Sequence, residues 1–333
     1  MNNKIGKLEE HTKIYLVNYN KFAGSWIYKG YSNAWQKQKN AYVVQPPKDF
    51  MNTNNDAKDP PYFFLYPNNE SGQSEKYIIQ ATADLIQDAV ALKAVERSYK
   101  TFLFVQPKVF PHPWGAHNNF VCLSDAAVIK ELDQMDNVYL WTFADVNKKF
   151  YTQWTKKIHT IPLAFDSVSY IPNDVPKYNQ FDISFIGGWA NNGFNEKRKI
   201  IIDIFSEFKK SGLKCGFFVN KGLTHQQECD ILANSKLVLN IHDAYQRILG
   251  LDTNERTFKS LGLNGALISD SVTQLENLFD YVPTSKTAKG IVEITHEYLA
   301  LPEDELREIK ERNKKDILEN HCYLNRVEQM LSL

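Results

Sequence analysis

Residues 182–188, DISFIGG, decide the fold that this sequence predicts. The apolar run is typical of a buried strand in a parallel sheet, and its two glycines indicate a tight turn where the strand ends. A helical pattern follows over residues 196–211, so the stretch predicts a strand, a glycine turn and a helix. Ligands of doubly wound sheets bind outside the carboxyl ends of the strands, which makes this turn the first candidate site.

The same alternation of strand and helix continues on both sides of this stretch. Downstream, we expect strands at 214–219, 237–242 and 266–269 with helices at 224–234 and 253–263. Upstream, we expect strands at 13–18, 41–45, 101–106, 138–142 and 158–162, with helices at 24–39, 77–99, 125–135 and 146–155. Parallel strands need such crossover helices, so the pattern predicts an α/β protein of two Rossmann-like, doubly wound lobes.

The length of 333 residues also favours two domains, because one domain usually has roughly 100–200 residues. Residues 163–178 contain two prolines and little periodicity, which is typical of a linker. We therefore predict an N-terminal lobe over 1–172, a C-terminal lobe over 173–315 and a closing helix over 316–333.

Composition excludes several classes of protein. The 39 basic and 39 acidic side chains give a formal net charge of zero, which disfavours nucleic acid as a partner. Cys122, Cys215, Cys229 and Cys322 lack metal-ligand spacing and are expected to be reduced thiols. The polar N-terminus and the lack of an apolar run of about 18 residues predict a cytoplasmic protein whose membrane contacts would be peripheral.

The glycine turn carries the first group of candidate ligand-binding residues. Gly187 and Gly188 let backbone N–H groups approach a phosphate at the next helix N-terminus, beside Asn191. Lys197 and Arg198, in the first turn of that helix, would add positive charge for a diphosphate. The alternative is an ordinary tight turn followed by a solvated basic pair.

A second group of candidates starts the helix predicted at 253–263, whose sequence reads NERTFKSLGLNG from residue 254. Because this helix follows the strand at 237–242, its first turn should reach the same edge of the sheet as the glycine turn. Glu255 would accept ribose hydroxyls and Arg256 would stabilise phosphate charge. The alternative is an exposed helix face with Phe258 and Leu261 directed inward.

Candidates for a general base lie in the N-terminal lobe. His112 and His117 belong to the proline-rich loop after the strand at 101–106, and an imidazole with an ordinary pKa near ~6.5 suits proton transfer. Asp125 and Asp145 are the carboxylate alternatives, although aspartates at such positions also cap helices.

Four further residues follow predicted strands. Asn20 and Gly24 would line the site near the phosphates or serve as ordinary turn residues. His242 and Asp243 would point to a bound sugar, unless His242 is a buried, hydrogen-bonded side chain. No pair of aspartates in DxD spacing ends a predicted strand, so neither a metal nor a cofactor is expected.

Several motifs in the C-terminal part occur together in one known family. The segments LAFDSVSYIPNDVPKYNQFDISFIGG, LVLNIH, NERTFKSLGLNGALISD and HCYLNRVEQML resemble the C-terminal lobe of GT-B glycosyltransferases, especially the spore-maturation-type branch of group 1. The layout is also similar to that of bacteriophage DNA glucosyltransferases. The resemblance implies two lobes with a cleft between them and a final helix crossing back to the first lobe, with Tyr323 and Val327 packing across the boundary.

The resemblance places Gly187 and Gly188 on the diphosphate loop, Arg198 on a basic phosphate contact and Arg256 on the motif arginine. The sequence departs from the family at Lys259, where a ribose-binding glutamate is usual. Leu251 likewise occupies the first position of the paired glutamates of retaining enzymes. Glu255 would then bind the ribose, or Lys259 would bind an acidic donor.

The resemblance implies a hexosyltransferase-like glycosyltransferase that acts in the cytoplasm, for example in polysaccharide biosynthesis. It would move a sugar from a nucleotide-sugar, UDP- or GDP-linked, to a hydroxyl of a glycan, a lipid-linked saccharide or a metabolite, without a metal. Glucosylation of modified DNA bases is one alternative, against which the zero net charge counts. An inactive protein that binds sugar-nucleotides is another, suggested by Lys259.

Overall fold

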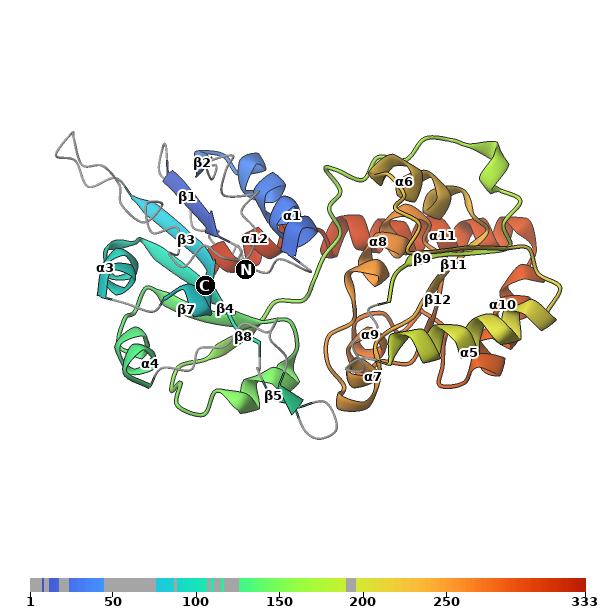
Figure 1. Cartoon of the computed structure of the whole chain (residues 1–333). Helices are drawn as coiled ribbons and strands as arrows, with labels where there is room; N and C mark the ends of the chain where they lie inside the picture. Colours follow the sequence, from blue (N-terminus) through green and yellow to red (C-terminus); the bar gives the residue numbers. More distant parts are fainter. Residues whose placement is uncertain are drawn as a thin grey trace. The chain divides into compact units, whose positions relative to one another are not determined.

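The computed structural model describes Leu8 and residues 12–17, 24–44, 76–86, 89–106, 109–110, 115–116, 126–189 and 196–333. Contacts divide the chain into two compact units, one made of Met1–Pro162 with Arg326–Leu333 and the other of Leu163–Asn325. The domain limits expected from the sequence, after residues 172 and 315, stay predictions. Each unit is described by itself below (Figure 1).

The first unit contains a six-stranded sheet in the order β2-β1-β3-β4-β7-β8. Its strands are β1 (Thr12–Val17), β2 (Ala41–Val44), β3 (Tyr77–Thr82), β4 (Lys100–Phe104), β7 (Val138–Thr142) and β8 (Ile158–Thr160). All neighbouring strands are parallel. The six residues of β3 are buried, as expected for a central strand that is covered on both faces.

Helices and short elements complete this unit. They are α1 (Gly24–Lys37), α3 (Ala89–Arg97), α4 (Ala126–Asp133), the 3₁₀ helices η2 (Ala83–Leu85) and η3 (Asp145–Phe150), and the antiparallel pair β5 (Val109–Phe110) and β6 (Gly115–Ala116). Helix α1 packs against β1 and β2, whereas α3 packs against α4.

One element differs clearly from the prediction. The helix expected over residues 77–99 is wrong in its first part, because Tyr77–Thr82 form β3 and only Ala89–Arg97 are α-helical. Strand β3 pairs with β1 on one side and with β4 on the other. These non-local pairings outweigh the local helical pattern of the segment.

The second unit contains a five-stranded sheet in the order β10-β9-β11-β12-β13. Its strands are β9 (Ile183–Gly187), β10 (Cys215–Val219), β11 (Leu237–Asn240), β12 (Leu267–Asp270) and β13 (Thr284–Ser285), and every pair is parallel. The motif DISFIGG thus forms β9, next to the centre of the sheet, and its second glycine follows the strand.

Helices cover both faces of this second sheet. The helices of this unit are η4 (Pro176–Tyr178), α5 (Lys197–Lys210), α6 (His225–Asn234), α7 (Ala244–Leu249), α8 (Glu255–Leu263), α9 (Thr273–Leu278), α10 (Ala288–Leu299) and α11 (Glu303–Asn320). The last helix, α12 (Tyr323–Leu331), begins in this unit and lies mostly in the first. Helices α5 and α10 pack together on one face, and α6, α8 and α11 lie on the other (Figure 1). The α/β fold with two parallel sheets and surrounding helices is therefore confirmed.

The C-terminal segment, expected as one helix, consists of two. Helix α11 ends at Asn320 and α12 begins at Tyr323. Residues Arg326–Leu333 belong to the first unit, where Arg326 Nε donates a hydrogen bond of 2.9 Å to the carbonyl of Pro162. In the described part of the chain, no helix combines the length and the apolar character that a membrane crossing requires.

Candidate functional site

The glycine turn at the end of β9 makes room for an arginine. A Cβ atom on Gly187 would lie 2.6 Å from Arg256 NH2 and 2.9 Å from the ring of Phe185. A Cβ atom on Gly188 would collide with the side chain of Asn220, a residue that itself has a left-handed φ of 50°. A Cβ atom at either glycine would thus displace a neighbouring side chain, and the turn and the first turn of α8 lie together as the sequence predicts.

Arg256 is held by backbone and side-chain acceptors at the carboxyl edge of the sheet. Its Nε donates to the Ile186 carbonyl at 2.6 Å, and its NH1 donates to Asn240 Oδ1 at 3.2 Å and more weakly to the Ile241 carbonyl at 3.4 Å. The guanidinium also lies 4.9 Å from the centroid of the Phe185 ring. Among the described residues, NH2 has no hydrogen-bond acceptor, so this edge of the guanidinium still has donor capacity that they do not use.

Lys197 adds a second cation close to Arg256. It begins α5, is only 5% exposed, and its Nζ donates to the carbonyl of Ile241, which NH1 of Arg256 also approaches. Its Nζ lies 3.5 Å from Asp243 Oδ1. Burial lowers the pKa of Lys197 to about 8, although Asp243 acts in the opposite direction. An anion bound here would stabilise the charged form of this lysine.

Arg198 lies in a different environment from Lys197, although the sequence assigns both to one basic pair. Its side chain is exposed, and its guanidinium carbon lies 5.9 Å from the centroid of the Trp189 ring. Lys197 is therefore not part of a solvated pair, whereas Arg198 has the exposed position that the alternative interpretation describes.

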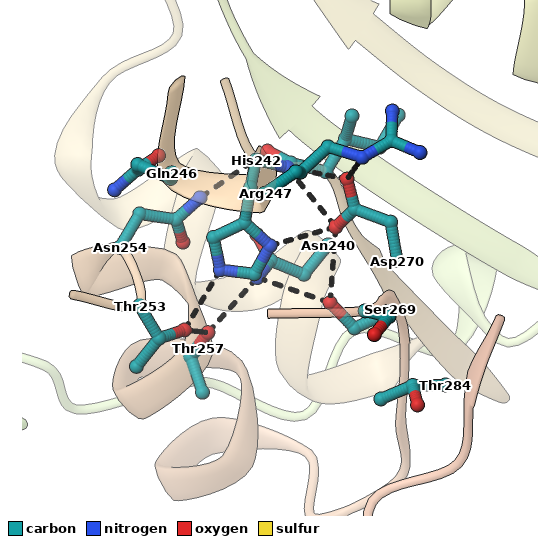
Figure 2. Close-up of polar contacts among 12 residues, drawn as sticks. Asn240, His242, Gln246, Arg247, Thr253, Asn254, Thr257, Ser269, Asp270 and Thr284 are labelled. Atoms are coloured by element: carbon teal, nitrogen blue, oxygen red, sulfur yellow. Dashed lines mark hydrogen bonds and ion pairs between the residues drawn. The ribbon is translucent and has the colours of Figure 1, made fainter. Parts of the chain in front are cut away.

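His242 is completely buried, at 0% exposure. Figure 2 shows its ring between Asp270, whose Oδ1 lies 2.7 Å from Nδ1, and Thr253, whose Oγ1 lies 2.8 Å from Nε2. Burial lowers the pKa of His242, although Asp270 opposes this effect, so the ring is neutral near pH 7. This geometry favours the interpretation of His242 as a buried, hydrogen-bonded residue over a direct contact with a sugar.

Glu255 and Lys259 of α8 form a compact charge cluster with Glu228 of α6. Lys259 Nζ lies 2.6 Å from Glu228 Oε1 and 3.3 Å from Glu255 Oε2, and 5.5 Å from the centroid of the Tyr170 ring. Burial raises the pKa of Glu255, while Lys259 acts against this rise. Burial opposes the charge on Lys259, but Glu255 and Glu228 raise its pKa above the ordinary value. Two carboxylates thus already neutralise Lys259.

The candidates for a general base are mostly outside the described residues. His112, His117 and Asp125 fall there, as do Asn20 and Asn191 of the proposed ligand site. Gly24 is the first residue of α1. Asp145 begins η3 in the first unit, where its Oδ1 accepts hydrogen bonds from Lys148 Nζ at 2.6 Å and from Thr160 Oγ1. These two hydrogen bonds lower the pKa of Asp145, which weakens it as a base.

Sequence reasoning missed several residues of this region. Phe185, Asn240, Thr257 and Asp270 contact or support the candidates. Thr257 lies in the first turn of α8, whereas only positions near strand ends could have indicated the other three. Asn240 ends β11 and Asp270 ends β12. A polar residue at the carboxyl end of an apolar strand is the signal that would have found both. No three His, Cys, Asp or Glu side chains of the described ranges gather in a way that would hold a metal ion.

Comparisons with known proteins agree with this architecture. Residues 190–332 match a family model described as glycosyl transferase-like, whereas no curated protein matches the sequence. The structure is similar to the N-terminal domain of trehalose-6-phosphate phosphatase from Candida albicans, with a TM-score of 0.58 and 10% identity over 98% of this chain and 97% of that one.

Two further solved structures are similar over nearly their whole length. One is an α,α-trehalose-phosphate synthase (UDP-forming) from Burkholderia vietnamiensis, with a TM-score of 0.51, 8% identity and coverage of 96% of both chains. The other is an α-glucosyltransferase in complex with UDP-glucose and DNA containing an abasic site, with a TM-score of 0.50, 9% identity and coverage of 96% and 99%. The protein therefore has the GT-B glycosyltransferase fold, and its C-terminal part matches the glycosyl transferase-like family.

Proposed function

We propose that the protein transfers a sugar from a nucleotide-sugar donor to a hydroxyl group of an acceptor. The observation that carries this proposal is the NH2 edge of Arg256, which has no acceptor among the described residues and is held beside Gly187 at the carboxyl end of β9. A fixed guanidinium next to a glycine turn is suited to a diphosphate, which accepts bidentate hydrogen bonds from arginine. The match of residues 190–332 to the glycosyl transferase-like family supports the same proposal.

In the reaction, the bond between the sugar anomeric carbon and the diphosphate oxygen breaks, and a bond to the acceptor oxygen forms. The leaving nucleoside diphosphate gains negative charge as its bond breaks. Arg256 and the neighbouring Lys197 would stabilise this charge as fixed cations, a form of electrostatic stabilisation that does not require a divalent metal. The acceptor proton passes to a base, for which His112, His117 and Asp145 remain the candidates.

UDP-sugars are the first donors to test, and GDP-sugars the second. The similar α-glucosyltransferase was solved with UDP-glucose, and the similar trehalose-phosphate synthase is described as UDP-forming. For the acceptor we propose a hydroxyl of a glycan, a lipid-linked saccharide or a metabolite, in the cytoplasm. The formal net charge of zero provides no general attraction for duplex DNA, which favours these acceptors over modified bases.

The test is the release of nucleoside diphosphate from UDP-glucose and other nucleotide-sugars by wild type, Arg256→Ala and Arg256→Lys. Removal of one fixed donor of this kind typically costs about 10²–10³-fold in turnover, so we expect Arg256→Ala to lose about 10²-fold or more. Arg256→Lys should recover only part of this loss, because an ammonium cannot contact the Ile186 carbonyl and a phosphate with the geometry of a guanidinium.

Arg307→Ala is the matched control, because Arg307 is an exposed arginine on α11 of the same unit. This variant should turn over the donor at the wild-type rate. Wild-type turnover by a folded Arg256→Ala protein would refute the role of Arg256. Tight binding of a nucleotide-sugar by the wild type without any release of nucleoside diphosphate would instead indicate a binding protein and contradict the proposed activity.

A further inference from the structure

A group of buried polar side chains lies beneath Arg256 and has no role in the proposed reaction. Asn240, His242, Thr253, Thr257 and Asp270 are each 0% exposed. They come from the carboxyl ends of β11 and β12 and from the start of α8, and they form one continuous set of hydrogen bonds (Figure 2). We call these five residues the hydrogen-bond chain.

The direction of the first two hydrogen bonds follows from Asp270. Its ionised carboxylate can only accept, so Nδ1 of His242, at 2.7 Å, must carry the ring proton. Nε2 is then an acceptor in the neutral ring, and the hydroxyl of Thr253, at 2.8 Å, must donate to it. Burial acts to raise the pKa of Asp270, but the contact with His242 acts to lower it. The pKa of this carboxyl is lowered as a result, which keeps it ionised.

The remaining directions follow one from another, because each threonine hydroxyl has a single hydrogen. Thr253 uses its hydrogen on His242, so it accepts from Thr257 at 2.6 Å. Thr257 in turn accepts from Asn240 Nδ2 at 2.9 Å. A parallel branch has the same direction, since Asn240 Nδ2 contacts Ser269 Oγ and Ser269 Oγ donates to Asp270, both at 3.4 Å.

These directions determine which atom of Asn240 faces Arg256. Asn240 Nδ2 donates to Thr257 and also lies 3.3 Å from the acceptor Nε2 of His242. The amide oxygen Oδ1 is therefore left for Arg256 NH1 at 3.2 Å. If His242 carried its proton on Nε2 instead, each hydroxyl would reverse and Thr257 would donate to Asn240. The amide of Asn240 would then turn its nitrogen Nδ2 toward the guanidinium, and two hydrogen-bond donors would face each other.

We propose that Asp270 and His242 are positioning residues for Arg256, which hold the Asn240 amide with its oxygen toward the guanidinium. They act through Thr253 and Thr257 and through the contact of His242 Nε2 with Asn240 Nδ2. The chain thereby sets the orientation in which NH2 of Arg256 faces the turn at Gly187. The identity of the ligand that Arg256 would bind rests on the function proposed above. The tautomer and the direction of the chain do not depend on it.

The first test measures the tautomer of His242 directly, without a ligand. Protein labelled with ¹⁵N-histidine contains eight histidines, and the signal of His242 is assigned by comparison with the His242→Gln variant. We expect chemical shifts of a neutral ring with the proton on Nδ1 at pH 7. A ring protonated on Nε2, or on both nitrogens, would overturn the proposal.

The second test breaks the chain at a neutral side chain, without changing any charge. Thr257→Val keeps the shape of the side chain and removes its hydroxyl, Thr257→Ser restores the hydroxyl, and binding of UDP and of pyrophosphate is measured by calorimetry. Ser260→Ala is the matched control, because Ser260 is a buried hydroxyl of the same helix, and its Oγ has no hydrogen-bond partner among the described residues.

We expect Thr257→Val to weaken UDP binding by up to about tenfold, the upper end of the usual effect of losing a hydrogen bond between neutral groups. Thr257→Ser and Ser260→Ala should bind like the wild type, although Thr257→Ser deletes a buried methyl group and should lower the melting temperature slightly. Unweakened binding by a folded Thr257→Val protein would overturn the proposal, as would equal weakening by Ser260→Ala. Failure of the wild type to bind either probe would count against the proposed function, while the histidine spectrum would still decide the direction of the chain.

Discussion

The buried charge of Lys197 predicts a specific pH dependence of donor binding. A fall of the lysine pKa from 10.5 to about 8 corresponds to about 3 kcal/mol of destabilisation of the charged form. The folded pKa lies below the unfolded value, so the full cost is present below pH 8. The cost decreases between pH 8 and 10.5 and disappears above that range. A bound diphosphate would offset part of this cost.

The affinity of the wild type for UDP should therefore fall as the pH rises through about 8, because the free protein then loses the proton that the anion stabilises. The decrease should approach tenfold per pH unit at its steepest. The second phosphate ionisation, with a pKa near ~6, is complete in this range and does not contribute. Calorimetric titrations with UDP between about pH 7.5 and 9.5 measure the effect.

Lys197→Met removes the charge and keeps the apolar stem, so its UDP affinity should be lower at pH 7.5 and nearly independent of pH. Its free energy of unfolding at pH 7 should rise by up to about 3 kcal/mol. The loss of the ion pair between Lys197 and Asp243 should reduce this gain. Lys199→Met is the matched control, since Lys199 is exposed on the same turn of α5.

Lys310 is half-buried, and burial lowers its pKa to about 8 as well, so it titrates in the same range. It lies on α11 and donates to the Ser235 carbonyl, so it affects stability in all variants equally. A wild-type UDP affinity that does not change between pH 7.5 and 9.5 would refute the reasoning. An identical slope in Lys197→Met would refute it too.

Three other predictions follow from the second unit. Gly187→Ala should weaken UDP binding by about tenfold or more with the fold intact, since its Cβ would displace Arg256 NH2. Gly212→Ala is the control: a Cβ atom there meets open space but the φ is +76°, so this variant should lower only the melting temperature. Burial raises the pKa of Asp252 from 3.8 to about 6, so the protein loses stability as the pH rises from 3.8 to 6. The free energy of unfolding of Asp252→Asn, measured by urea denaturation, should therefore exceed that of the wild type by up to about 3 kcal/mol at pH 8 and by almost nothing at pH 3. In a thermal-shift panel of nucleotide-sugars, a UDP-sugar should give the largest shift, since a ligand at about 100 times its Kd stabilises by roughly 2.7 kcal/mol; a shift with CMP-sugars alone would contradict this donor assignment.

Much of the fold could be predicted because apolar runs and turn residues agree along most of the chain. DISFIGG is the clearest example, with four buried strand residues followed by the glycine turn. The prediction failed at Tyr77–Thr82, where an apolar run continues directly into the helical pattern of Ala89–Arg97. Only the pairing of β3 with two distant strands decides this segment, and such pairing leaves no local signal.

The candidate site was partly predictable for a similar reason. Strand ends and helix starts meet at one edge of a parallel sheet, so Gly187 and Arg256 could be placed together from their positions in the sequence. The burial of Lys197 beside an exposed Arg198 could not be predicted from the sequence, because it depends on the residue at which α5 begins. Glu196, directly before this helix, has a left-handed φ of 48°, and nothing in the sequence indicates this conformation. The hydrogen-bond chain likewise depends on side-chain directions that only the structure contains.

A crystal structure of the protein with UDP tests the central claim most directly. The account predicts that the diphosphate lies at the turn formed by Gly187 and Gly188, with at least one of its oxygens within hydrogen-bond distance of Arg256 NH2. A diphosphate bound elsewhere, with NH2 of Arg256 still lacking an acceptor, would contradict it.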